Sequence, residues 1–143
     1  QNIRLLIVGR GRKDKEIKDK IKNIINITFI NEYVPNRDLA KYIMESKFVI
    51  LPYKTATGTQ TIQIANYYNK MVLTTKVGCF KEYIKEGKNG LFINKQEYKS
   101  LKEAILNAME YKIDDRQKLL INEEYKKFDL IKTANKLYSI INS

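Results

Sequence analysis

Short apolar runs alternate with segments of helical spacing from the start of the chain to about Lys95, and this alternation constrains the fold more than any other feature. Runs such as Ile3–Val8 ("IRLLIV") and Phe48–Leu51 ("FVIL") are continuous and are closed by Gly9 and Pro52, which is typical of strands buried on both faces. Sequential strands joined by single helices predict right-handed crossovers and a parallel sheet. We therefore expect an α/β, Rossmann-like parallel sheet with helices on both faces and a C-terminal helical tail.

The bounds of the expected elements follow from apolar spacing and from the turn residues between them. The predicted strands are Ile3–Val8, Ile27–Ile30, Phe48–Leu51, Met71–Thr74 and Leu91–Ile93. The predicted helices are Asp14–Ile25, Arg37–Ser46 capped by Asn36, Thr59–Asn69, a short helix within Lys76–Gly90, Lys95–Tyr111, Asp114–Lys126 and Asp129–Ile141. The residues expected to face the core from the first two helices are Ile17, Ile21, Ile24, Ile25, Leu39, Ala40, Ile43 and Met44. With no repeat, linker or internal boundary visible, we expect one domain over residues 1–143.

The composition excludes several kinds of chemistry. The chain has no His and a single cysteine, Cys79, so an internal disulfide, a zinc site and a Ser-His triad are ruled out. No apolar run approaches the roughly 20 residues of a membrane span. No secretory leader precedes the first predicted strand, and together with the lone cysteine this favours a cytoplasmic location.

The net charge of +11 suggests nucleic acid, an anionic membrane or a phosphorylated ligand as a partner. However, the 27 basic residues comprise 22 Lys and only 5 Arg, whereas nucleic-acid readers depend on Arg for bidentate contacts. The chain is also rich in Ile and Asn, so a compositional bias could account for the lysine excess. The charge therefore leaves both interpretations open.

The loops that follow the predicted strands are where function is expected. Ligands of open parallel sheets bind at the carboxyl ends of the strands, against helix N-termini. The loops after Val8, Ile30, Leu51 and Thr74 are therefore predicted to share one rim of the sheet.

The segment Leu51–Val72, "LPYKTATGTQTIQIANYYNKMV", starts a predicted helix inside a loop of Thr, Ala and Gly. Thr55, Thr57, Gly58 and Thr59 lie at this start, and no carboxylate accompanies them. The first turn of a helix has backbone N–H groups without partners, and its dipole favours negative charge. Two interpretations stay open from the loop alone: this end is reserved for an outside anion, or Thr59 is simply an N-cap.

The segment Gly9–Asp14, "GRGRKD", forms a second turn after a strand. It has the first two glycines of a dinucleotide fingerprint, but the third position is Asp14, and a lone Gly-x-Gly is a weak signal. It is either a tight turn or a site of ligand approach with Arg10 or Arg12 near an anion. Glu32 could hold a ribose in a nicotinamide dehydrogenase, although its loop suits another interpretation better.

Three further polar residues follow the predicted strands. Gln60 and Gln63 lie three apart on the predicted helix, where Gln63 could reach a ribose or sugar hydroxyl, although two exposed helix-forming glutamines are the simpler interpretation. Glu82 follows the turn "VGCF" and could bond a neighbouring amide, bond a sugar hydroxyl or cap the short helix.

The order of motifs resembles the C-terminal, donor-binding half of retaining GT-B glycosyltransferases of family four. The matching pieces are "IRLLIVGRG", "ITFINEYVPNRDLAKYI", "FVILPYKTATGTQTIQIANYYNKMVLTTKVGCFKEYI", "EGKNGLFI" and the tail ending "ANKLYSII". The resemblance covers nearly the whole chain, in the family's order and with near-usual spacing.

The resemblance implies a donor site at the loop before the Thr59–Asn69 helix and around it. The diphosphate of a nucleotide sugar would lie against Thr57, Gly58, Thr59 and Gln60, and the nucleobase along Tyr33, Val34 and Pro35. The full set of implied donor-binding residues is Gly9, Arg10, Tyr33, Val34, Tyr53, Lys54, Thr57, Gly58, Thr59, Gln60, Gln63 and Glu82. No catalytic residue and no metal ligand is assigned, and a UDP-sugar or GDP-sugar would bind without a metal ion or other cofactor.

The chain departs from the family pattern in two ways. Many members carry two glutamates eight positions apart around this helix start, where the chain has Ala56 and Ile64, so the usual ribose contact is in doubt and Gln63 is the substitute we expect. An earlier strand and helix, and a whole N-terminal acceptor domain, are also missing from these 143 residues. Either the chain is part of a longer protein or a partner chain supplies the rest, and the isolated piece should bind donor poorly and transfer little.

The resemblance also implies the reaction and its setting. We expect retaining transfer of a sugar to a hydroxyl acceptor, sugar or lipid-linked, in bacterial surface polysaccharide or glycolipid synthesis. The location would be cytoplasmic, with the lysines suited to an anionic inner membrane surface, and no nucleic-acid partner is expected. Two alternatives remain: a catalytically inactive partner subunit with the same fold, and a basic nucleic-acid-binding module.

Overall fold

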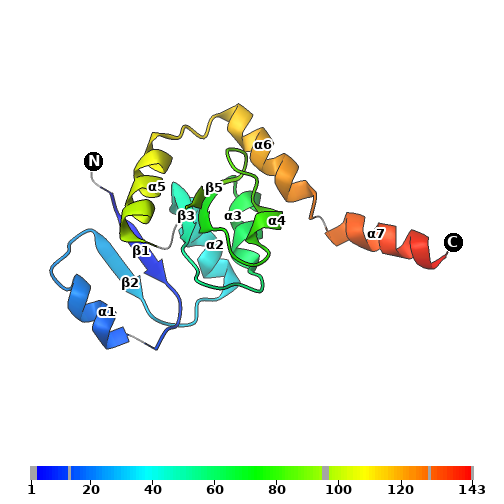
Figure 1. The fold of residues 1–143 in the computed structure, drawn as a ribbon. Helices are drawn as coiled ribbons and strands as arrows, with labels where there is room; N and C mark the ends of the chain where they lie inside the picture. The colour runs from blue at the N-terminus through cyan, green and yellow to red at the C-terminus, as the bar shows by residue number, and fades with distance from the viewer. Residues whose placement is uncertain (1–2, 13, 95–96, 129, 143) are drawn as a thin grey trace. The chain divides into compact units, whose positions relative to one another are not determined.

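The computed structural model describes residues 3–12, 14–94, 97–128 and 130–142 (Figure 1). Strands and helices alternate as expected as far as β5, and three helices follow. The elements in chain order are β1 (Leu5–Val8), α1 (Asp14–Ile21), β2 (Ile27–Ile30), α2 (Asn36–Glu45), β3 (Phe48–Leu51), α3 (Gln60–Tyr67), β4 (Met71–Thr75), α4 (Phe80–Tyr83), β5 (Gly90–Ile93), α5 (Tyr98–Glu110), α6 (Asp115–Lys126) and α7 (Leu130–Ile141).

All strand pairs that the structure describes are parallel, which confirms the predicted α/β class. β1 pairs with β2, with Leu5 opposite Ile27. β3, β4 and β5 pair in that order, with Phe48 opposite Met71 and Val72 opposite Gly90. The hydrogen bonds thus form a two-stranded and a three-stranded sheet in place of the single sheet predicted, so the rim shared by four loops stays a prediction.

The chain divides into two compact units, Gln1–Leu39 and Ala40–Ser143. The first contains β1, α1 and β2. The second contains β3, β4 and β5 with the helices that contact them: α3 packs on β4 and on α6, and α5 packs on β4 and β5. The prediction of one domain over the whole length stays a prediction.

The core of the second unit is centred on β4, all five residues of which are buried. Ile62 and Ala65 from α3, Leu73 from β4 and Phe80 from α4 are completely buried. A strand with both faces covered reads as a continuous apolar run, and "MVLTT" follows that rule except for the two threonines at its end. Those threonines lie where β4 approaches the end of β3 and the loop after it, and their hydroxyls donate to the carbonyls of Leu51 and Tyr53.

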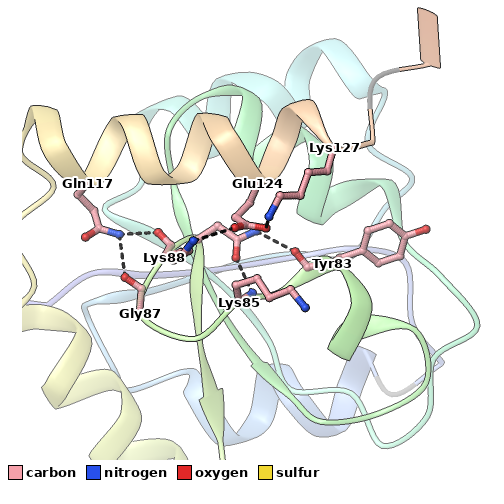
Figure 2. A network of polar contacts seen from close by, with 8 residues as sticks. Tyr83, Lys85, Gly87, Lys88, Gln117, Glu124 and Lys127 are labelled. Carbon is pink, nitrogen blue, oxygen red and sulfur yellow. Dashed lines mark hydrogen bonds and ion pairs between the residues drawn. The ribbon is translucent and has the colours of Figure 1, made fainter. Parts of the chain in front are cut away.

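A network of hydrogen bonds and ion pairs connects α6 to the turn between α4 and β5 (Figure 2). The completely buried Asn89 accepts a hydrogen bond from the Lys85 amide at 2.8 Å and donates one to the Tyr83 carbonyl at 2.8 Å. Gln117 of α6 donates to the carbonyls of Gly87 and Lys88. The side-chain amides of Asn89 and Gln117 therefore both have partners, and the helix is held against the turn by directional bonds.

A buried carboxylate completes this network. Glu124 is 2% exposed, and its two oxygens lie 2.6 Å from the Lys127 ammonium and 3.4 Å from the Lys88 ammonium (Figure 2). Burial raises the pKa of Glu124, but the hydrogen bonds and charges of Lys127 and then Lys88 outweigh it, so the pKa lies below its ordinary value. The carboxylate is therefore ionised at neutral pH.

The first unit buries less than its apolar runs predict. Leu5 and Leu6 are 39% and 38% exposed, and α1 has no buried residue, so the prediction of a first strand buried on both faces is wrong for the described chain. α1 also ends at Ile21, four residues earlier than predicted, because the chain turns there to enter β2. Ile25, expected in the core, is 99% exposed.

The remaining helices begin and end close to the predicted residues. Met44 of α2 faces solvent, contrary to expectation, while Ile43 is buried. α2 begins at Asn36 itself, and α6 begins after an Asp114 N-cap whose side chain accepts from the Gln117 amide at 2.8 Å. The predicted starts at Lys95 and Asp129 lie outside the described residues. Of the helices in the described ranges, none is long and apolar enough to span a membrane.

Candidate functional site

The loop between β3 and α3 forms the best-defined candidate site. Pro52 ends the strand because it has no N–H for the ladder, and the Tyr53 amide turns back to the Leu51 carbonyl at 2.9 Å. The residues that follow are mostly exposed, and a hollow opens above them. Its lining consists of Tyr53, Thr55, Ala56, Thr57 and Gly58.

The N-terminus of α3 lies at this hollow. Thr59 is the N-cap, with its hydroxyl accepting from the Thr61 amide at 3.2 Å, so the simpler of the two interpretations of Thr59 is realised. The cap satisfies one donor only. Within the part of the chain that the structure describes, the backbone N–H groups of Gly58, Thr59 and Gln60 have no hydrogen-bond partner. The first turn of α3 also contains no acidic residue, so this end can still receive an anion.

Side chains from β4 and the turn after it hold the other side of this loop. Thr75 donates to the Tyr53 carbonyl at 2.5 Å, and the Cys79 thiol donates to the Thr57 carbonyl at 3.2 Å. These two residues were not predicted as part of the site. The available signal was the pair Thr74–Thr75 at the end of a buried strand, because a buried hydroxyl needs an acceptor nearby.

The two glutamines of α3 have different surroundings. Gln60 is exposed, as the simpler interpretation expects. Both polar side-chain atoms of Gln63 are buried and lack a partner among the described residues, and the same holds for Asn66 one turn further on. A ribose contact by Gln63 would therefore require neighbouring side chains to move, and this role stays a prediction.

The turn after β1 lies beside the loop after β2 in the first unit. The Asn31 side chain accepts from the Gly11 amide at 2.6 Å and donates to the Gly11 carbonyl at 3.2 Å. Gly9 has a φ of 135° and continues the ladder through its amide to the Ile30 carbonyl at 3.0 Å. The predicted residues Gly9, Arg10, Tyr33 and Val34 all belong to these two loops.

The start of α1 differs electrostatically from that of α3. Asp14 is its first residue, Glu16 follows in the same turn, and Lys18 lies 2.8 Å from the Asp14 carboxylate. The hydrogen bond from Lys18 holds the pKa of Asp14 below its ordinary value. The α1 N-terminus therefore already has its own negative charge, which argues against the Gly9–Asp14 turn as a phosphate site.

Two remaining predictions concern Lys54 and Glu82. Lys54 is exposed in the loop before α3, where its ammonium can approach an anion. Glu82 lies inside α4 and is exposed; it does not cap that helix, because Cys79 occupies the N-cap position and no side chain bonds there. Across the described ranges, no group of three or more Cys, Asp and Glu side chains could hold a metal ion.

Comparison with known sequences gives one family. The profile of the family described as "Glycosyl transferases group 1" matches residues 1–127. Comparison with curated proteins finds no match in sequence.

Solved structures share the fold at low sequence identity. The catalytic domain of starch synthase IV from Arabidopsis thaliana, bound to ADP and acarbose, has a TM-score of 0.70 and 16% identity, with 95% of this chain and 31% of that one covered. Anabaena Alr3699/HepE with UDP-glucose has a TM-score of 0.70 and 19% identity, with 97% and 40% covered. The same protein with UDP and glucose has a TM-score of 0.71 and 18% identity, again with 97% of this chain and 40% of that one covered. The chain therefore spans 31% to 40% of the length of these solved chains.

Proposed function

The chain belongs to the group 1 glycosyl transferases, and on this premise we propose that it binds the nucleoside diphosphate sugar from which a sugar is transferred. The observation that carries the proposal is the set of N–H groups at Gly58, Thr59 and Gln60 without partners among the described residues, beside a hollow and without an acidic neighbour in the first helical turn. Starch synthase IV is bound to ADP and Alr3699/HepE to UDP-glucose, and a nucleoside diphosphate is the group that these two ligands have in common.

The proposed chemistry is electrostatic. Amide hydrogens aimed at the diphosphate stabilise the negative charge that grows on it as the sugar–phosphate bond breaks. The exposed Lys54 adds a positive charge from the same loop. We propose that the stabilisation requires no metal ion, that transfer retains the configuration of the sugar, and that the departing phosphate takes the proton of the acceptor hydroxyl. No side chain of the chain is assigned as a nucleophile or general base.

The other predicted donor contacts are proposed residue by residue. We propose that Tyr33 and Val34 lie along the nucleobase and that Gly9 and Arg10 face the donor. Tyr33 supports the role, since its ring is largely exposed and available for stacking. Gln63 remains the candidate for the ribose, and Glu82 for a sugar hydroxyl.

The acceptor is proposed to bind elsewhere, because the chain spans only 31% to 40% of the solved proteins that it matches. A sugar or lipid-linked acceptor held by a further domain or a partner chain, in bacterial surface polysaccharide or glycolipid synthesis, fits this proposal. The net charge of +11 supports a cytoplasmic location peripheral to an anionic membrane. We therefore propose that the lysines do not bind nucleic acid.

Calorimetric titration of the 143-residue chain with UDP, GDP and ADP, and then with the monophosphate of the base that binds best, tests the proposal. One diphosphate is expected to bind best and to name the base. The matching monophosphate should bind at least about tenfold more weakly, because it loses charge-assisted hydrogen bonds to the second phosphate. If none of these nucleotides binds, the result contradicts donor binding and favours the inactive-subunit alternative. Tight RNA binding with a steep salt dependence would favour the nucleic-acid alternative.

A further inference from the structure

Three carbonyl groups of the strand and loop before α3 accept hydrogen bonds from side chains of a neighbouring segment. Thr74 donates to the Leu51 carbonyl at 2.9 Å, Thr75 to the Tyr53 carbonyl at 2.5 Å, and Cys79 to the Thr57 carbonyl at 3.2 Å. The three donors lie on β4 and the turn after it, within six residues of one another.

These side chains continue the sheet where the backbone ladder stops. Leu51 is the last residue of β3 to pair with β4, opposite Thr74, and Pro52 has no N–H with which to pair further. The hydroxyls of Thr74 and Thr75 replace the missing ladder bonds. The two residues are 0% and 3% exposed, so water competes little for these hydroxyls.

The turn that contains Cys79 also lies in close contact with the loop. Gly78 has a φ of 49°, and a Cβ at this position would lie 1.8 Å from the Ala56 carbonyl oxygen. Only glycine permits the two backbones to approach so closely. The Tyr53 ring packs on the buried Phe80 with a centroid distance of 5.5 Å, which fixes the start of the loop against the same segment.

The orientation of the carbonyls has a consequence for an anion. A carbonyl oxygen that turned toward a phosphate would repel it, and a hydrogen bond to a side chain of β4 or its turn restrains the carbonyl against turning in this way. With the carbonyls of Tyr53 and Thr57 held in this way, the N–H groups of Gly58, Thr59 and Gln60 are left for the ligand. Donors fixed in advance need no reorganisation when negative charge develops.

We propose that Thr75 and Cys79, with Gly78 between them, are positioning residues for the donor diphosphate. They act through the loop carbonyls and do not touch the ligand. This inference rests on the proposed function, because it assumes that the loop before α3 receives the diphosphate.

Thr75→Val tests the inference, with Thr75→Ser as its matched control. Valine has nearly the shape of threonine but no donor, whereas serine retains the hydroxyl. Removing one hydrogen bond should weaken UDP binding by roughly tenfold in Thr75→Val and by less than about twofold in Thr75→Ser. The affinity for uridine, which has no phosphate, should be the same in both variants, and this ratio separates positioning from general loss of structure.

The outcomes distinguish the inference from the proposed function. If the unmodified chain binds none of UDP, GDP and ADP, the proposed function fails and the inference fails with it. If it binds GDP or ADP in place of UDP, that diphosphate and its nucleoside replace UDP and uridine in the comparison. If it binds UDP and Thr75→Val binds equally well, or loses UDP and uridine in parallel, donor binding stands and the positioning role is overturned. Should Thr75→Val not fold, Cys79→Ala against Cys79→Ser carries the same comparison at a partly exposed position.

Discussion

Gly58→Asp is expected to weaken the binding of UDP by at least about 100-fold, because it places a carboxylate beside the N–H groups proposed to hold the diphosphate. Two like unit charges about 5 Å apart repel by roughly 3 kcal/mol at an effective dielectric constant of about 20, and this corresponds to a factor of about 100 in affinity. Steric effects should be small, since a Cβ on Gly58 would meet only the Cys79 sulfur, at 3.9 Å. Calorimetry with UDP measures the loss.

The same substitution should act in the opposite direction on stability. A carboxylate near the N-terminus of α3 interacts favourably with the helix dipole, so the free energy of unfolding should rise by about 0.3–1 kcal/mol. Gly58→Asn is the matched control, with nearly the same shape and no charge, and it should retain most of the UDP affinity. Equal losses in the Asp and Asn variants would show that shape, and not charge, limits the site, and would contradict an anion-binding role.

Removing both cations around Glu124 is expected to destabilise the chain by about 3 kcal/mol at neutral pH, because a buried carboxylate is then left without a partner. The variant is the double substitution Lys88→Met and Lys127→Met. Adding Glu124→Gln to it should restore part of the loss, since a neutral amide costs less to bury than a charge. Urea unfolding of the double and triple variants measures the difference.

Lys118→Met provides the control, because its ion pair with Asp115 is exposed at the surface. Its effect should stay below about 0.5 kcal/mol. A triple variant no more stable than the double variant would contradict the idea that the unpaired charge, and not the lost packing of the lysine stems, causes the destabilisation.

The contribution of Glu124 also predicts a pH dependence. Because its pKa in the folded state lies below the ordinary value of 4.5, the ionised form is favoured by folding. The stabilisation is therefore fully present above about pH 4.5 and is lost as the pH falls through the folded pKa. As the pH falls below about 4.5, the Glu124→Gln chain should therefore lose less free energy of unfolding than the unmodified chain.

Local patterns predicted the strands better than the ends of the helices. β2 and β3 have the predicted bounds, because short apolar runs closed by turn residues leave few alternatives. The first helix was predicted too long because Ile24 and Ile25 continue its apolar spacing, although both are exposed in the structure. Spacing alone cannot tell that the chain must turn at this point to bring β2 beside β1.

The loop before α3 could be recognised from its Thr and Gly residues and the absence of a carboxylate, but the groups that shape it could not. Thr75 and Cys79 act on carbonyls 22 residues earlier in the chain, and only the pairing of β3 with β4 brings them there. The burial of the polar atoms of Gln63 was also missed, because α3 packs on β4 and α6 and this packing cannot be read from local sequence. Contacts of this kind follow from tertiary structure and leave little trace in local sequence.

Amide chemical shifts of the nitrogen-15-labelled chain during titration with UDP would show whether the diphosphate lies at the N-terminus of α3. We expect the N–H signals of Gly58, Thr59 and Gln60 to move downfield, as free amides acquire charged acceptors, and to saturate at the dissociation constant found by calorimetry. If UDP binds while those three signals stay in place and those of the turn near Gly11 move, the diphosphate lies elsewhere and the account is wrong.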